Sequence, residues 1–355
     1  MVKTFYLTKK QTTLLEKLSQ AMGISGNEGE VRSVILEEIR PYISDHQVDA
    51  LGNLLVTRQG SANNRLKVMV AAHMDEVGFM IAADDGEGIF RFESVGGIDV
   101  RQLPGKSVLV GKDHLPGVIG ARPIHLTTAS ERQNKIPLEK LRIDVGPGKN
   151  PIKPGDQAVF NTNFRRVGPS LIGKALDDRL GVAVLIELIK DAPENIDLQA
   201  AFTVQEEIGS RGARVAAFSF KPDLAFVVDS TPANDLPSWD DAENVTYNTH
   251  LGEGPAIYVA DGATLSDPRL IRLLKQTAEK ESIPFQLRQP GGGGTDAGTI
   301  HKQAGGIPSV SVSIPGRYSH TAAGVARVSD YVNTVALLKA TLRSIQPEFL
   351  AQERK

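Results

Sequence analysis

"VMVAAHMDEVGFMI", residues 68–81, places an apolar run directly before a group of polar side chains. Five apolar residues, Val68–Ala72, precede His73, Asp75 and Glu76. A short apolar run without alternation is typical of a strand buried on both faces, and such strands occur mainly in parallel sheets covered by helices. The stretch therefore predicts a buried strand that ends at His73 and carries metal-competent side chains at its carboxyl end.

The composition narrows the class of protein. The chain has 355 residues, 41% of them hydrophobic, which suffices for a large core and about two domains. A formal net charge of −2 without long Lys/Arg runs argues against a nucleic-acid partner. The absence of cysteine excludes disulfides, thiolate metal sites and thiol nucleophiles. With no long apolar stretch and no leader-like N-terminus, we expect a cytoplasmic protein with no membrane partner.

Outside residues 86–167 the chain alternates between helical and strand-like patterns. Residues 8–40 predict two helices, with Ser25 or Asn27 as the cap of the second, and residues 46–60 predict a hairpin that turns at Gly52-Asn53. Residues 177–193 predict a strongly amphipathic helix, and helices are also predicted at 266–282 and 328–345. Buried strands alternate with these helices. We therefore expect an α/β fold: a mostly parallel, mixed sheet with helices on both faces.

Residues 86–167 differ in texture, because short β-like runs alternate with Pro-Gly and Gly-Lys-Asp turns. This pattern is typical of a small barrel or sandwich. A polar segment inside it, residues 122–140, is expected to be a long loop. We place an inserted, barrel-like β domain at 77–167, between two halves of a catalytic domain at 1–76 and 168–355.

Metal-competent residues recur at the predicted strand ends and at one helix start. In open parallel sheets, ligands bind beyond the carboxyl ends of the strands, so residues far apart in sequence can converge there. The residues are His73, Asp75, Asp177, Asp178, Glu206, Glu207, Asp229 and His320.

Each of these residues also has an ordinary structural explanation. A lone histidine at a strand end is more often structural than a ligand, and Asp177 and Asp178 could simply cap a helix. Adjacent acids repeated along one sheet edge would, however, repel each other without a cation between them. Two histidines with three or four carboxylates suit a pair of divalent ions, Zn²⁺ or Co²⁺ rather than Mg²⁺ or Ca²⁺. One glutamate of Glu206-Glu207 could then bind metal while the other acts as general base.

Six motifs in order resemble the tetrahedral aminopeptidases, a family of dinuclear metallopeptidases that includes glutamyl aminopeptidases. The resemblance covers essentially the whole chain, the inserted β domain included, and implies a zinc-exopeptidase-like fold. The motifs are "AAHMDEVGFMI" (71–81), "KALDDRLGVAVLIEL" (174–188), "QEEIGSRGA" (205–213), "FVVDSTPA" (226–233), "GGGGTDAGTIH" (291–301) and "IPGRYSHTAA" (314–323).

The resemblance implies a role for each matching residue. It assigns His73 and Asp229 to one metal, Glu207 and His320 to the other, Asp177 as the bridge, Glu206 as general base and Asp75 as the partner of His73. It also implies a cis Asp177–Asp178 peptide. The implied activity is removal of N-terminal residues from short peptides with a free N-terminus. The implied partners are copies of the same chain: the β domain forms dimers, which assemble into a tetrahedral dodecamer.

The glycine-rich motif is interpreted as a substrate-binding segment. Gly293, Gly294 and Thr295 would approach a bound peptide, with Thr295 or Asp296 capping the next helix. Arg317 is a candidate for binding an acidic substrate. Structural pairing is expected for Arg179, and a salt bridge for Glu76.

Departures from the family pattern lie near the expected substrate pocket: an extended glycine run at 291–294 and an acidic stretch at 238–250. The sequence therefore does not give the preferred N-terminal residue of the substrate. Two alternatives to the aminopeptidase also stay open. One is a related dinuclear deacylase or carboxypeptidase. The other is a catalytically silent, metal-stabilised scaffold.

Overall fold

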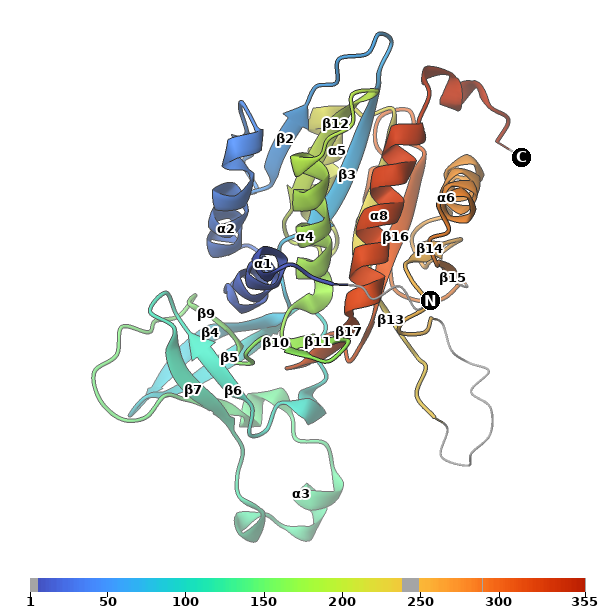
Figure 1. The fold of residues 1–355 in the computed structure, drawn as a ribbon. Coiled ribbons are helices and arrows are strands. Elements are labelled where there is room, and N and C mark those ends of the chain that lie inside the picture. Colours follow the sequence, from blue (N-terminus) through green and yellow to red (C-terminus); the bar gives the residue numbers. More distant parts are fainter. Residues whose placement is uncertain (1–5, 238–248, 289, 355) are drawn as a thin grey trace.

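The computed structural model describes residues 6–237, 249–288 and 290–354. Most of the acidic stretch at 238–250 thus lies outside the described residues. Figure 1 shows a large sheet flanked by helices and, beside it, a smaller β-barrel built from the middle of the chain. Among the described residues, no helix is both long and apolar enough to span a membrane. The α/β class and the inserted barrel expected from the sequence are both confirmed.

The large sheet has a parallel centre and antiparallel edges. Strands β12, β3, β13 and β16 are parallel neighbours, so their carboxyl ends meet at one edge. In sheet order the main path is β1 (Gln47–Val48), β2 (Leu54–Arg58), β12 (Ile196–Thr203), β3 (Leu66–His73), β13 (Leu224–Pro232), β16 (Ser309–Arg317), β17 (Gly324–Arg327), β11 (Ser170–Gly173) and β10 (Arg165–Val167); β14 (Ala256–Tyr258) and β15 (Gln286–Arg288) lie off this path.

The quoted apolar run is the centre of this sheet. Val68, Val70 and Ala72 of β3 belong to the core that packs under α1 (Lys9–Gln20), α2 (Gly29–Ile39), α4 (Leu176–Lys190) and α8 (Val328–Ser344). Met69 and Ala71 face the opposite core, under α5 (Arg211–Phe220) and α7 (Ala297–Ile300). Because alternate side chains point to opposite faces, a strand covered on both sides reads as continuously apolar.

Two local predictions about helices are wrong. Helix α4 is buried on almost every side rather than amphipathic, because α1, α2 and α8 cover the surface that would otherwise meet solvent. The cap position of helix α2 is Glu28, not Ser25 or Asn27, and no side chain caps the helix; the hydroxyl of Ser25 donates to Asp75 instead. The predicted helix near 266–282 is α6 (Pro268–Glu281), capped by Asp267.

The barrel closes in the order β4-β5-β8-β7-β6-β9. Its core holds Phe79 in edge-to-face contact with Phe92 and Phe160, both at centroid distances of 5.2 Å. Residues 165–167, expected in the insertion, form β10 and pair with β11 in the large sheet. The barrel strands are β4 (Gly78–Gly86), β5 (Ile89–Val95), β6 (Ser107–Val110), β7 (Leu115–Gly120), β8 (Arg142–Asp144) and β9 (Gln157–Phe160).

The polar segment at 122–140 is mostly loop, as predicted, with one short helix, α3 (Ala129–Gln133). Its Thr128 and Glu131 form a reciprocal capping box, a signal that the sequence contained. Short 3₁₀ turns complete the chain: η1 (Arg40–Tyr42), η2 (Val100–Gln102), η3 (Ile124–Leu126), η4 (Leu138–Lys140) and η5 (Pro347–Ala351).

Candidate metal centre

His73 lies at the end of β3, with its side chain 3% exposed. Its Nε2 atom is 3.3 Å from Oδ1 of Asp177 and 3.7 Å from Oδ1 of Asp229. Its Nδ1 atom is 3.0 Å from the main-chain carbonyl oxygen of Asp75, and 3.6 Å from that residue's carboxylate. The carbonyl oxygen therefore accepts the ring proton and leaves Nε2 facing the two aspartates.

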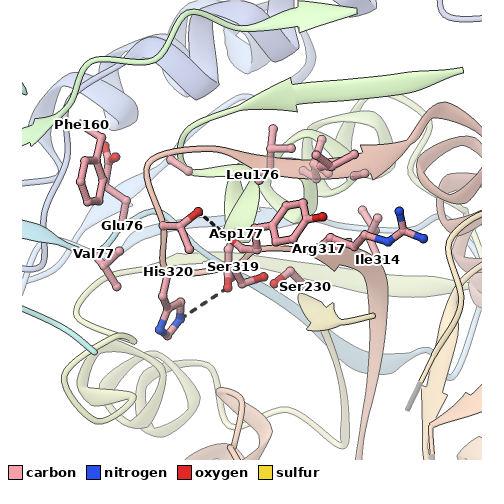
Figure 2. A pocket seen from close by; sticks show the side chains of 18 of the residues that line it. Glu76, Val77, Phe160, Leu176, Asp177, Ser230, Ile314, Arg317, Ser319 and His320 are labelled. Carbon is pink, nitrogen blue, oxygen red and sulfur yellow. Dashed lines mark hydrogen bonds and ion pairs between the residues drawn. The ribbon is translucent and has the colours of Figure 1, made fainter. Parts of the chain in front are cut away.

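A second group of potential ligands lies on the other side of Asp177. Nε2 of His320 is 3.2 Å from Oε2 of Glu207. It is also 3.6 Å from Oδ2 of Asp177, and Figure 2 shows His320 and Asp177. The Nδ1 atom of His320 is 2.9 Å from the carbonyl oxygen of Gly97, in the loop that follows barrel strand β5. Asp177 thus turns one oxygen toward each histidine, which is the arrangement of a bridging carboxylate.

Both groups have ligand atoms close enough to share an ion. In each set of three, His73 with Asp177 and Asp229, and Asp177 with Glu207 and His320, all the atoms lie within 4.8 Å of one another. Imidazole nitrogens with carboxylate oxygens are the ligand chemistry that suits Zn²⁺ and similar ions. The residues present therefore fit a two-ion centre.

The backbone around Asp177 is unusual, as the resemblance implied. The Asp177–Asp178 peptide is cis, and Ala175 just before it has φ of 51°. Asp178 is fully buried, and its carboxylate accepts from the N–H groups of Gly181 (3.0 Å) and His73 (3.3 Å). Asp178 therefore supports the strand end and the helix start rather than joining either ligand group.

Asp75 supports the acidic pair through its carboxylate. Oδ1 accepts from the N–H of Glu206 at 3.0 Å, and Oδ2 accepts from the N–H of Glu207 at 3.1 Å and from the hydroxyl of Ser25 at 2.6 Å. The carboxylate of the buried Glu28 accepts from the N–H of Gln205, the residue before Glu206, at 3.2 Å. Sequence reasoning missed Ser25 and Glu28 in this role, because neither lies near a ligand in the sequence.

Glu206 stays outside both ligand groups. Its carboxylate accepts from the hydroxyl of Ser210 at 3.1 Å and lines the same cavity as the ligands. Burial raises its pKa well above the usual range, an effect that the nearby His73 opposes and that Asp229 increases. A carboxylate beside the ligands, but not among them, is placed to exchange a proton with a reacting group.

The pKa values show how strongly the carboxylates of this site repel one another. Burial raises the pKa of Glu207 well above its usual range and that of Asp229 to about 6, with Asp177 adding to both shifts. Burial would also raise the pKa of Asp177, but hydrogen bonding to His73 lowers it to about 2. Burial lowers the pKa of His73, yet Asp177, Asp229 and Asp75 raise it well above 6.5. Divalent cations would offset this surplus of buried negative charge.

A cavity of about 640 Å³ adjoins the ligands and is lined by Gly293, Gly294 and Thr295 of the glycine-rich segment. The two glycines present their backbone to it. The Thr295 hydroxyl lies 2.7 Å from that of Ser311 and accepts from the N–H of Ala297, so it caps α7. Asp296 occupies the N-cap position but makes no side-chain cap, and the hydroxyl of Thr295, one residue earlier, accepts from the first N–H of the helix instead.

A narrower, more apolar pocket lies between Asp177 and the barrel. Figure 2 shows Val77, Phe160 and Leu176 around it, with His320 at its rim. Phe160 is the last residue of barrel strand β9 and Val77 directly precedes β4, so the insertion forms part of the wall as well as holding His320 through Gly97.

The arginines near the centre are engaged by other groups. Arg317 donates to Asp235 at 2.6 Å, and lines the narrow pocket rather than the larger cavity. Arg179 is fully buried, bonds to four main-chain carbonyls and lies 3.1 Å from Glu76, which also pairs with Lys174 at 2.6 Å. The structural pairing of Arg179 and the salt bridge of Glu76 are confirmed.

Comparison with known proteins places this architecture among peptidases. A relative from Acetivibrio thermocellus is 40% identical over 331 residues, covering 92% of this chain and 96% of the relative. The glutamyl aminopeptidase of Lactococcus lactis subsp. cremoris is 31% identical over 354 residues, covering 95% and 97% of the two chains.

Two solved structures that are similar to this chain are also those of peptidases. A TET aminopeptidase from the archaeon Thaumarchaeota archaeon SCGC AB-539-E09 is 32% identical with a TM-score of 0.91, over 96% of this chain and 98% of the other. The TET1 peptidase of Pyrococcus horikoshii, described as assembling into a tetrahedron or a large octahedral shell, is 35% identical with a TM-score of 0.83, over 94% and 100%. The model of the M42 glutamyl aminopeptidase family matches residues 52–337. The two groups of potential ligands and the inserted barrel are consistent with this match. The chain therefore belongs to the M42 glutamyl aminopeptidase family, whose members are metal-dependent aminopeptidases.

Proposed function

We propose that this aminopeptidase binds two divalent ions and uses Glu206 as its general base. His73 and Asp229 would hold one ion, Glu207 and His320 the other, and Asp177 would contact both. The observation that carries the proposal is the division of the two Asp177 oxygens between the two histidines, at 3.3 and 3.6 Å. Zn²⁺ and Co²⁺ are the ions that best match the nitrogen and carboxylate ligands.

When bound, such ions lower the pKa of a water molecule and polarise a peptide carbonyl. Glu206 accepts the proton of the attacking water and delivers a proton to the leaving amine. The N–H groups of Glu206 and Glu207, both bonded to Asp75, keep the two carboxylates in separate positions. The base therefore stays beside the reacting carbonyl, while its neighbour stays with the ligands.

The substrates we propose are short peptides with a free N-terminus. The α-amino group is recognised beside the ligand carboxylates, and the rest of the peptide runs along Gly293 and Gly294 in the 640 Å³ cavity. Arg317 would act on substrate through the narrow pocket that it lines, held in place by Asp235. Peptides with an acetylated N-terminus should not be cleaved, whereas a carboxypeptidase or deacylase would accept them.

The test is a panel of aminoacyl p-nitroanilides assayed with chelator, and again after Zn²⁺ or Co²⁺ is added back. We expect activity to disappear with chelator and to return with metal. Glu206→Gln should lower kcat by about 10²- to 10⁴-fold while two metal equivalents stay bound. Absence of chelator-sensitive turnover on every substrate would overturn the proposal. A silent scaffold predicts that Glu206→Gln changes nothing measurable.

We further propose that the chain acts in the cytoplasm as a homo-oligomer, in which barrel domains at 77–167 form dimers and dimers assemble into a tetrahedral dodecamer. The support is that the P. horikoshii relative assembles into a tetrahedron. Native mass spectrometry should give a mass twelve times that of the chain. A species no larger than a dimer at micromolar concentration would contradict the dodecamer.

A further inference from the structure

Arg288 is a buried arginine in the cavity that holds the ligand groups. It ends strand β15, is 4% exposed, and lines the cavity together with His73, Glu206 and Asp229. Neither the proposed metal centre nor the proposed proton transfer uses it. A buried guanidinium is costly unless an anion or several acceptors satisfy it.

The guanidinium is held rigidly in one place. Nε donates to Oγ1 of Thr231 at 3.2 Å, Nη1 to the carbonyl of Ala260 at 3.2 Å, and Nη2 to the carbonyl of Gly292 at 2.9 Å. Its carbon lies 4.3 Å from the ring centroid of Tyr258, a cation–π contact. The position is therefore set by four neighbours from three segments, before any ligand binds.

None of these neighbours carries a negative charge. Over the described residues, no carboxylate oxygen lies within 4 Å of an Arg288 nitrogen, whereas the two other buried Lys/Arg side chains among them, Lys174 and Arg179, both pair with Glu76. A guanidinium has five N–H donors, so one on each terminal nitrogen stays without an acceptor among those residues. One remaining N–H on each terminal nitrogen is the number of donors that a carboxylate takes when it binds through both of its oxygens.

A second cation faces the same cavity. Lys302 follows α7, is exposed and lines the cavity, and the described part of the chain offers its ammonium no carboxylate within 4 Å. The cavity thus combines carboxylates at the ligand groups with two cations that lack an anionic partner among the described residues.

Arg288 also lies at a suitable distance from the proposed metal ligands to contact a bound peptide. Its partner Thr231 is two residues beyond Asp229 on β13, which is about 7 Å along a strand. A bound peptide spans about 3.5 Å per residue. A carboxylate one or two residues away from the cleaved bond therefore reaches the guanidinium.

We propose that Arg288, assisted by Lys302, is a carboxylate-binding subsite for the peptide substrate. The inference rests on the proposed aminopeptidase function and extends it to a substrate class: peptides that place a carboxylate about two residue lengths from the reacting carbonyl. That carboxylate is either the side chain of an acidic N-terminal residue or the C-terminus of a di- or tripeptide.

Two matched substrate pairs distinguish these sources. The p-nitroanilides of Glu and Gln differ in the side-chain carboxylate alone. Leu-Gly-Gly and its C-terminal amide differ in the terminal carboxylate alone. For the metal-saturated wild-type enzyme we expect kcat/KM for the charged member of at least one pair to exceed that of its neutral partner by about 10- to 100-fold, the usual worth of a charge-assisted hydrogen bond.

Variants then locate the effect. Arg288→Gln should abolish the preference for the charged member, Arg288→Lys should keep part of it, and Lys302→Gln should reduce it by less. Arg214→Gln, an exposed position on α5 outside the cavity, is the matched control and should keep the full preference. Circular dichroism of each variant verifies folding.

Two results would overturn the subsite. One is a wild-type enzyme that cleaves both neutral substrates but favours neither carboxylate, a result that needs no folded variant. The other is a preference that persists unchanged in Arg288→Gln. Both leave the aminopeptidase proposal intact, whereas failure to cleave any substrate would count against that proposal instead.

Discussion

Replacing Asp75 with asparagine should separate the support of the acidic pair from metal binding itself. The Asp75 carboxylate is fully buried and accepts three hydrogen bonds: from the N–H groups of Glu206 and Glu207 and from the hydroxyl of Ser25. An asparagine side chain has one acceptor oxygen. Whichever way the amide is oriented, its NH₂ group faces at least one backbone N–H, so a donor meets a donor.

The expected loss of stability follows from the number of hydrogen bonds that asparagine cannot accept. One buried N–H without an acceptor costs about 1–3 kcal/mol, and the remaining bonds lose their charge assistance, so we expect the free energy of unfolding to fall by about 2–4 kcal/mol. Because Glu206 loses its fixed position, kcat at saturating metal should fall by about 10- to 100-fold, the usual effect of removing a support of a metal site. The main-chain carbonyl that accepts from His73 is unchanged by the substitution.

Ser25→Ala is the matched control. It removes only the hydroxyl and leaves both N–H acceptors, so it should cost about 1 kcal/mol and change kcat by less than about threefold. Urea unfolding followed by circular dichroism gives the stability, and p-nitroanilide hydrolysis at saturating Zn²⁺ gives kcat. The reasoning would be refuted if Asp75→Asn kept wild-type kcat. It would also be refuted if Ser25→Ala lowered stability and kcat as much as Asp75→Asn does.

Three further predictions concern separate parts of the molecule. Glu76→Gln leaves buried Lys174 and Arg179 without their shared carboxylate and should lower the free energy of unfolding by about 3–5 kcal/mol in urea titrations; a loss below 1 kcal/mol would contradict the pairing. His320→Ala should leave one metal equivalent per chain by elemental analysis, where two would show that His320 is not a ligand. Burial raises the pKa of Asp330 to about 6 from 3.8, so the folded state retains a proton that the unfolded state releases; its stabilising effect is full below pH 4 and is lost as pH rises to 6, and Asp330→Asn should remove that part of the pH dependence in thermal unfolding scans.

Local sequence patterns were sufficient for most of the elements and for the group of metal-competent residues at the sheet edge, while the role of each residue came from the family resemblance. The apolar run before His73 predicts a two-sided buried strand, and parallel strands necessarily bring their carboxyl ends to one edge. His73, Glu207 and Asp229 could therefore be placed together without coordinates. Helix α4 was misjudged because the pattern of a single helix does not reveal how many neighbours cover it.

What the sequence by itself determined is the kind of chemistry: which side chains gather, at which edge of the sheet, and in which family. Only the tertiary structure decided which atoms face each other. The carbonyl of Gly97 in the barrel holds His320, the carboxylate of Asp75 holds the backbone of the acidic pair, and Arg288 faces the cavity without an anion among the described residues. These contacts join segments more than a hundred residues apart or depend on loop conformation. Their geometry is set by packing of the whole chain, because no local pattern records which distant donor will meet which acceptor.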